Sequence, residues 1–175
     1  VSEGWSVNSL LNRIAEAKSP QFNALIDTGA LITGMTNLQV ARYLLDHGLS
    51  WCEGVVYLDE YDRKMILVRA TGRVVKMAQS GIPANKRFAF YDQVSLRCRN
   101  DILFLWLGSL YELNQVHTTG MDIQHMLNAK AVLTLGKDMT FRDYAQGAFR
   151  MRGIAKGQTI HLFIIPEVHQ LMQRE

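Results

Sequence analysis

The sequence predicts an α/β fold with a mostly parallel sheet covered by helices. Short apolar runs of strand length alternate with stretches in which apolar residues recur at helical spacing. Glycines and prolines separate these segments, as they do at turns between regular elements. Apolar residues make up 48% and charged residues 20% of the 175 residues, proportions that are typical of a chain with a buried core.

The N-terminal part predicts a helix, a strand and a second helix. Apolar residues recur at helical spacing over residues 8–17. A short apolar run, Asn23–Asp27, predicts a strand. The next helix has Thr36 or Asn37 as its cap and ends at Gly48, because these residue types satisfy the backbone at helix ends.

Strand-like runs dominate the middle of the chain. Four of them follow in order: Gly54–Leu58, Lys64–Arg69, Arg73–Met77 and Phe88–Tyr91. The turn Ala70-Thr71-Gly72 joins the second and third runs, so these two strands are expected to form a hairpin.

The C-terminal part predicts another strand–helix–strand unit. Its strands are Ala131–Leu135 and Thr159–Ile165, and Pro166 ends the second. The helix between them, Thr140–Met151, has Thr140 as its cap. Strands that alternate with helices favour parallel pairing, because a helix returns the chain to the same edge of the sheet.

The domain organisation contains one discordant segment. Residues 1–22 are interpreted as an N-terminal helix and linker, and residues 23–170 as one α/β domain. Residues 94–115 lack clear strand and turn signals and are flanked by a repeated dipeptide, Gln93-Val94 and Gln115-Val116. A retained intron would explain them, since Val-Ser can be encoded by a splice-donor consensus and Gln by an acceptor. A genuine surface insertion is the alternative.

Composition excludes several classes of function. A net charge of +3 is too small an excess to indicate nucleic-acid binding by itself. Cys52 and Cys98 form no CxxC pair, so neither a disulfide framework nor a zinc site is expected, and an intracellular setting, cytoplasmic or nuclear, fits best. The longest apolar run, Ile102–Leu107, is far below the ~20 residues of a membrane span. His117 and His125 lack partners at ligand spacing, so no metal site is expected.

The strongest indications of chemistry are a glycine–aspartate loop and an arginine-bearing helix. Gly120 lets the loop approach a ligand closely, and Asp122 can orient water, a ribose or the arginines themselves. Gln146 and Arg150 are four residues apart on the expected helix and so share a face, with Arg152 close by. Arginine suits phosphate because its fork donates two hydrogen bonds at once.

These two motifs resemble parts of a known motor. Thr119-Gly120-Met121-Asp122-Ile123 is similar to motif V of superfamily-2 helicases, especially its Gly-x-Asp-Ile form in SecA-like translocation motors. The run from Gln146 to Arg152 is similar to motif VI, usually Gln-x-x-Gly-Arg-x-Gly-Arg. Phe149 replaces the glycine before the first arginine, and Gly153 takes the slot of the second.

The helicase resemblance implies a fold, a cofactor and a partner. It implies a RecA-like C-terminal lobe, with Arg150 and Arg152 as catalytic arginines and Gly120, Asp122 and Gln146 as nucleotide-binding residues. ATP with Mg²⁺ would then be held mainly by a missing N-terminal lobe of the same parent protein, and this fragment alone would bind no cofactor. Closure on the nucleotide would couple to a protein or nucleic-acid partner.

A second resemblance covers most of the chain. Four runs resemble the conserved C-terminal region of very large eukaryotic proteins, which are built from domains of unknown function and commonly labelled ubiquitinyl hydrolase: Ala24–Thr36, Gly54–Lys64, Phe88–Gln93 and His117–Val168. This resemblance implies a thiol-dependent deubiquitinase that acts on ubiquitin or a ubiquitin-bearing protein. Neither Cys52 nor Cys98 has the signature of a nucleophile, so the nucleophile is expected elsewhere in the parent.

Three functions therefore remain open: a motor lobe, a catalytically silent accessory region of a deubiquitinase, and a structural interaction module with degenerate motifs. Two weaker patterns accompany them. Gly29–Thr36 has P-loop spacing, but Met35 stands where lysine belongs. Asp59 follows a strand as in a Walker B motif, although such acids also serve as turn residues. The loops at Asp27–Gly29, Asp59–Asp62 and His117–Asp122 are expected to gather at the carboxyl ends of the strands.

Overall fold

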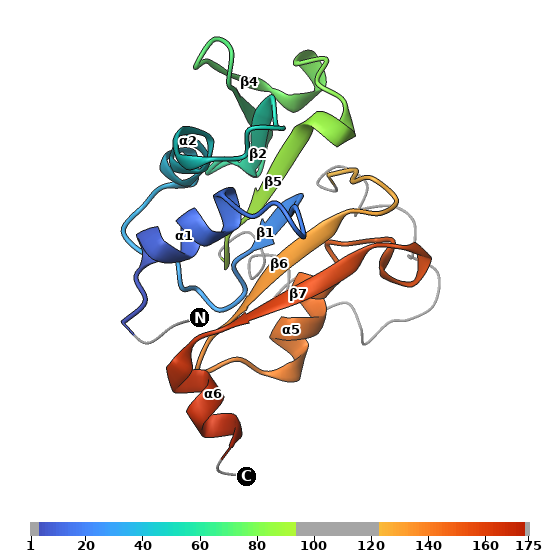
Figure 1. Ribbon diagram of the computed structural model, residues 1–175. Coiled ribbons are helices and arrows are strands. Elements are labelled where there is room, and N and C mark those ends of the chain that lie inside the picture. Colours follow the sequence, from blue (N-terminus) through green and yellow to red (C-terminus); the bar gives the residue numbers. More distant parts are fainter. Residues whose placement is uncertain (1–3, 94–122, 174–175) are drawn as a thin grey trace.

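The computed structural model describes residues 4–93 and 123–173 of the protein (Figure 1). Residues 94–115 lie outside these ranges, so the retained-intron hypothesis stays a prediction. The same holds for Gly120 and Asp122 of the glycine–aspartate loop.

Seven strands and four α-helices make up the described residues. The helices are α1 (Val7–Ala15), α2 (Asn37–His47), α5 (Phe141–Ala148) and α6 (Pro166–Met172). The strands are β1 (Ala24–Ile26), β2 (Gly54–Leu58), β3 (Lys64–Val68), β4 (Val74–Lys76), β5 (Arg87–Tyr91), β6 (Lys130–Leu135) and β7 (Thr159–Ile164). Each strand expected from the sequence is present, with bounds that agree to within a residue or two. Short 3₁₀ turns precede β5 and β7.

The strands form a single mixed sheet in the order β4-β3-β2-β5-β1-β6-β7. The five strands from β2 to β7 in that order pair in parallel with their neighbours. The β3 strand pairs antiparallel with both β2 and β4, and the expected hairpin turn at residues 70–72 joins β3 to β4. The prediction of a mostly parallel α/β sheet is therefore confirmed among the described residues.

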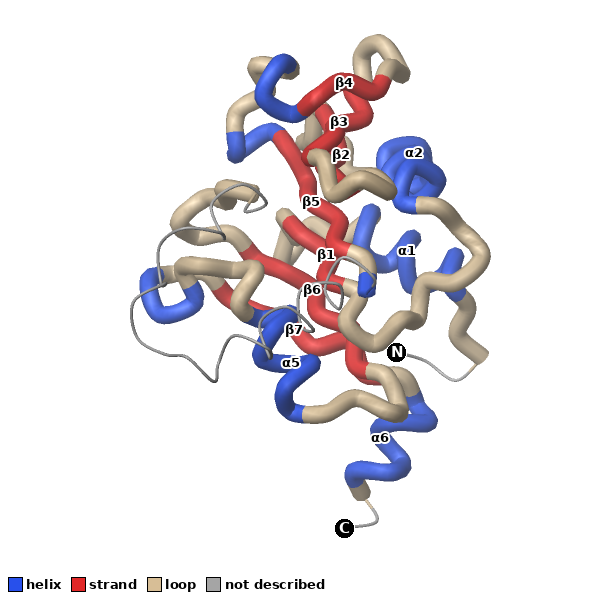
Figure 2. Tube along the Cα trace, turned by 180° about the vertical axis from the view of Figure 1, so that it is seen from behind, coloured by secondary structure: helices blue, strands red, loops and turns tan. Residues whose placement is uncertain are grey.

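The two faces of the sheet carry separate hydrophobic clusters. On β1, Leu25 belongs to the cluster that contains the buried residues of α1 and α2. Its neighbours Ala24 and Ile26 belong to the other cluster, together with Ala148 of α5. This alternation follows from the strand geometry, in which successive side chains point to opposite faces. Figures 1 and 2 show α1 and α2 on one side of the strands and α5 on the other.

The first two helices match the sequence pattern closely. In α1, Ser6 and Ser9 form a capping box. The buried Leu10, Leu11 and Ile14 of this helix belong to the same hydrophobic cluster as Leu25 of β1. In α2, Thr36 is the cap, since its side chain accepts a hydrogen bond from the backbone N–H of Gln39. Both expectations of helix position are confirmed.

The C-terminal helices differ from the sequence expectation. The helix expected over Thr140–Met151 begins at its predicted Thr140 cap but ends at Ala148. The expected strand end before Pro166 is confirmed, yet Pro166 also starts α6, which the sequence pattern did not predict. Proline suits the first turn of a helix because its missing N–H would have no intrahelical partner there.

Candidate functional site

The carboxyl ends of β1 and β6 form the topological switch point of the sheet. The chain leaves β1 towards α2 on one face and leaves β6 towards α5 on the other. In doubly wound sheets, ligands bind at such a point, because the two departing loops leave a crevice between them. Here the crevice is bordered by Asp27, Thr28 and Gly29 after β1, and by Thr134 and Gly136 around the end of β6.

A buried carboxylate joins the two sides of this crevice. Asp27 is 2% exposed, and Oδ1 accepts a hydrogen bond from the hydroxyl of Thr134 at 2.7 Å. Its two carboxylate oxygens also accept the backbone N–H groups of Leu31 and Ile32, at 3.0 and 2.9 Å. Burial raises the pKa of Asp27 above its usual value, even though these three hydrogen bonds lower it.

Backbone contact closes the crevice between β1 and β6. A Cβ atom on Gly29 would lie 2.5 Å from the backbone nitrogen of Gly136, so neither position has room for a side chain. The N–H of Gly29 donates to Thr134 Oγ1 at 3.0 Å. The point at which a doubly wound sheet ordinarily receives a ligand is therefore filled by the protein's own backbone.

The two nucleotide-like patterns in the sequence serve the fold. In the loop with P-loop spacing, the N–H groups of Gly29, Leu31 and Ile32 are all hydrogen-bonded within the protein, so they do not form an open anion cradle. Asp59 accepts the backbone N–H groups of Tyr61 and Arg63 and pairs with the Arg63 guanidinium at 2.7 Å. Asp59 therefore serves as a turn residue, which was the alternative to a Walker B acid in the interpretation of the sequence.

The loops after β1 and β2 lie at the same edge of the sheet, as expected. These strands run in parallel on either side of β5. At that edge, the side-chain amide of Asn37 donates to the carbonyl oxygen of Leu58 at 2.9 Å and so ties the start of α2 to the end of β2. The third loop of the expectation, His117–Asp122, lies outside the described residues.

The arginine-bearing segment is a helix followed by a tight turn. The N–H groups of Arg150 and Met151 donate to the carbonyl oxygens three residues earlier, so the chain leaves α-helical geometry after Ala148. Burial of Met151, which is 1% exposed, accompanies this change of direction. The expectation that Gln146 and Arg150 share one helix face is therefore corrected, because Arg150 stands in the turn beyond the helix.

Arg150 nevertheless reaches the carboxyl edge of the sheet. Its guanidinium carbon lies 5.7 Å from the centroid of the Tyr91 ring, and Tyr91 is the last residue of β5. Gln146 is half-buried within α5, and Arg152 is exposed in the turn that follows. Of the five site residues expected from the sequence, these three are described, and Arg150 contacts the end of a strand through the Tyr91 ring.

Gln158 anchors the arginine turn to the segment that leads into β6. Its side chain is 6% exposed and accepts the N–H of Gly153 at 2.7 Å while donating to the carbonyl oxygen of Met126 at 2.8 Å. No motif in the sequence singles out Gln158, since a glutamine before a strand carries no signature of function. Its two bonds join segments that are about 30 residues apart in the chain.

The described cysteine is buried and hydrogen-bonded. Cys52 is 1% exposed, and its thiol donates a hydrogen bond to the carbonyl oxygen of Gly54. Burial raises its pKa from 9.0 to about 11, so the thiolate is scarce at neutral pH. Within residues 4–93 and 123–173, no three His, Cys, Asp or Glu side chains are grouped so as to hold a metal ion.

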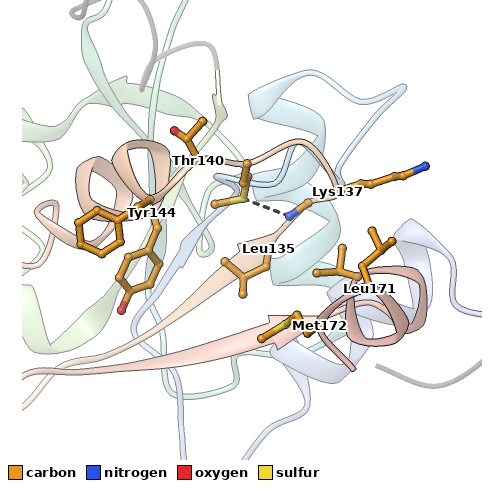
Figure 3. Close-up of a pocket in the computed structure, with 10 residues that line it drawn as sticks. Leu135, Lys137, Thr140, Tyr144, Leu171 and Met172 are labelled. Atoms are coloured by element: carbon orange, nitrogen blue, oxygen red, sulfur yellow. Dashed lines mark hydrogen bonds between the residues drawn. The ribbon is translucent and has the colours of Figure 1, made fainter. Parts of the chain in front are cut away.

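An open groove lies beyond the carboxyl end of β6, between the β6–α5 loop and α6 (Figure 3). Its volume is about 470 Å³, and Leu135, Tyr144, Leu171 and Met172 contribute much of its apolar lining. Beside the groove, the backbone N–H of Gly136 donates a hydrogen bond to the sulfur of Met139.

The helices of the described ranges are all too short or too polar to cross a membrane.

Comparisons with known proteins do not identify a relative. No protein-family model matches the chain, and neither the curated proteins nor the solved structures yield a match.

Proposed function

We propose that this chain is a RecA-like lobe of a nucleotide-driven motor, similar to the C-terminal lobe of superfamily-2 helicases. In this proposal Arg150 acts on ATP that is held mainly by another lobe of the same parent protein. The observation that carries the proposal is the position of Arg150 beside Tyr91, at the carboxyl end of a central parallel strand. Ligands of doubly wound sheets bind at this edge.

The sheet supports the architectural part of the proposal. The parallel strands β2-β5-β1-β6-β7 have β1 at their centre and crossover helices on opposite faces. This arrangement is consistent with a RecA-like lobe, although other doubly wound folds share it. Arg150 belongs to the connection between β6 and β7, on the face that carries α5.

The closed switch point supports the need for a second lobe. The Gly29–Gly136 contact fills the crevice, and the nearby N–H groups of Leu31 and Ile32 already bond Asp27. The described residues at this switch point therefore offer no cradle for the α- and β-phosphates. ATP and its Mg²⁺ would instead be bound by the partner lobe, with this edge facing the γ-phosphate.

An arginine at that edge has a defined chemical role. During hydrolysis the oxygens of the transferred γ-phosphoryl group share a growing negative charge, and a guanidinium can donate two hydrogen bonds to them. Such an arginine contributes on the order of 10³–10⁵ in rate because it acts on charge that is present in the transition state. Arg152, in the exposed turn two residues later, is the weaker candidate for a second contact.

The test is the ATPase rate of the intact parent protein with and without this side chain. We expect Arg150→Ala to lower kcat by about 10³ with a smaller effect on the KM for ATP. Arg150→Lys should restore little, because an ammonium cannot reproduce the bidentate geometry. The matched control is Arg142→Ala, an exposed arginine in the first turn of α5, the helix that precedes Arg150. Equal rates for wild type and Arg150→Ala would remove the proposed role.

A second candidate is a catalytically silent accessory region of a thiol-dependent deubiquitinase of the ubiquitinyl-hydrolase-labelled family. The inert environment of Cys52 favours it over a protease site within these residues. A ubiquitin probe with a vinyl electrophile should then label a cysteine of the parent protein other than Cys52, and Arg150→Ala should leave that labelling unchanged. Labelling of Cys52 would contradict the accessory role of this region.

A further inference from the structure

Tyr91 is fixed at the point where Arg150 meets the sheet. It ends β5, is 1% exposed, and lies in the hydrophobic cluster on the α5 face together with Ile26 and Leu133. Its hydroxyl lies 2.8 Å from Nε2 of His125, within hydrogen-bonding distance. The strand therefore holds one end of the side chain and His125 holds the other, so the ring has little freedom to turn.

The Arg150 guanidinium lies over this fixed ring. Its central carbon is 5.7 Å from the ring centroid, inside the roughly 6 Å range in which an arginine is attracted to an aromatic face. Arg150 follows the last turn of α5, and its backbone N–H donates to the carbonyl oxygen of Gly147 at 3.1 Å. The backbone thus sets where the side chain starts, and the ring limits where its charged end can go.

The side chain that fixes the Tyr91 ring, His125, is uncharged. Burial lowers the pKa of His125 to about 4, and the positive charge of Arg87 adds to the effect. His125 is therefore neutral at neutral pH and does not compete with Arg150 for the ring. Arg87 is directed elsewhere, since it donates to the carbonyl oxygens of Ile82 and Gln124.

We propose that Tyr91 is a positioning residue that holds the Arg150 guanidinium in place for the γ-phosphate, with His125 fixing the tyrosine in turn. This inference rests on the proposed motor function and adds a residue that neither helicase motif contains. A pre-positioned arginine acts in the transition state without first losing the freedom of a long side chain.

The experiment measures the kcat and KM of ATP hydrolysis by the intact parent protein. Tyr91→Leu removes the aromatic face, and we expect kcat to fall about 10-fold with little change in KM. Tyr91→Phe keeps the aromatic face but loses the contact with His125, so kcat should fall, by no more than about threefold. The matched control is Phe90→Leu, which removes a ring of similar burial from the neighbouring position of β5 on the opposite face. Tyr91→Met, with an unbranched side chain that refills the space, repeats the test if Tyr91→Leu does not fold.

A double variant assigns the effect to Arg150. If Tyr91 acts through Arg150, then Tyr91→Leu adds no further loss of kcat to Arg150→Ala. An equal further loss in that background, or an equal effect of Phe90→Leu, would overturn the positioning role. A normal rate for Arg150→Ala would instead overturn the proposed function and this role with it. An impaired Arg150→Ala beside a normal Tyr91→Leu would overturn the role of Tyr91 alone.

Discussion

The hydroxyl of Thr28, two residues beyond β1, occupies the space that a Cβ atom on Gly147 of α5 would fill. Thr28 is 3% exposed, and its hydroxyl oxygen has no hydrogen-bond partner among the described residues. A Cβ atom on Gly147 would overlap that oxygen and would also lie 3.2 Å from Cδ1 of Leu133. The absence of a side chain at residue 147 is therefore what brings α5, and with it Arg150, close to the sheet.

This contact predicts that Gly147→Ala has opposite effects on stability in the wild type and in a Thr28→Ala background. In the wild type, Gly147→Ala should destabilise the fold by roughly 1–2 kcal/mol, because overpacking outweighs the ~1 kcal/mol gain in helix propensity. With Thr28→Ala the obstructing hydroxyl is gone, and Gly147→Ala should then stabilise. Urea denaturation of the four proteins measures the coupling. Destabilisation of equal size in both backgrounds would show that the Thr28 hydroxyl is not the obstacle.

The hydrogen bond from Thr134 to Asp27 predicts a pH-dependent loss of stability. Thr134→Val leaves an Asp27 oxygen and the Gly29 N–H without this partner, at a cost on the order of 2 kcal/mol. Because the folded-state pKa of Asp27 is raised, its contribution to stability is fully present below its ordinary value of 3.8 and is lost as pH rises through the folded value. The Thr134 bond lowers that pKa, so its removal deepens the loss.

The loss of unfolding free energy that Thr134→Val causes should therefore be larger at about pH 7 than at about pH 4. Urea denaturation at the two pH values measures it. The matched control is Thr159→Val on the exposed side of β7, which should stay within about 0.5 kcal/mol of wild type at both. A deficit that shrinks with rising pH would contradict the assignment of the hydrogen bond to the charged carboxylate.

Most helices and strands were predictable from the sequence because their positions depend on local chemistry. The apolar runs, the Thr36 and Thr140 caps and the hairpin turn are visible within a few residues. The end of α5 depends instead on the burial of Met151 in the same hydrophobic cluster as Ile26 and Leu133, and α6 begins at a proline that also marks a strand end. Local periodicity contains neither fact.

The candidate site was predictable only in outline, because its contacts are between distant residues. The sequence put Asp27 at the carboxyl edge, but its partner Thr134 is 107 residues away. A threonine inside the apolar run Ala131–Leu135 was the available signal, since a buried hydroxyl requires a partner. Arg150 was identified by resemblance, and the ring beneath it, Tyr91, could be found only from the fold.

The environment of Cys52 predicts both its reactivity and an alkaline loss of stability. Its folded-state pKa of about 11 exceeds the ordinary 9.0, so its contribution to stability is fully present below pH 9 and lost as pH rises through about 11. This rise in the pKa corresponds to roughly 3 kcal/mol. In a Cys98→Ser background, iodoacetamide should leave native Cys52 unmodified near pH 8 and should modify it once urea unfolds the chain.

The stability part is measured against Cys52→Ala in the same background, because the difference between the two proteins cancels the titration of tyrosines and lysines. Cys52→Ala loses buried volume and should be the less stable protein near pH 8. Its deficit should narrow as pH approaches 11, where the wild-type thiol ionises. A deficit that is constant over this range, or rapid alkylation of the native protein, would contradict the buried, hydrogen-bonded thiol.

The bridge made by Gln158 predicts that one buried amide keeps the arginine turn ordered. Gln158→Met keeps the length of the side chain but leaves the N–H of Gly153 and the carbonyl oxygen of Met126 without these bonds, at a cost of about 2–4 kcal/mol. Amide hydrogen exchange at Gly153 should accelerate in this variant by more than the global loss of stability explains. The control is Gln170→Met on exposed α6, which should change neither quantity. If protection at Gly153 survives Gln158→Met, the turn is held by its own backbone, and Gln158 does not connect it to the segment before β6.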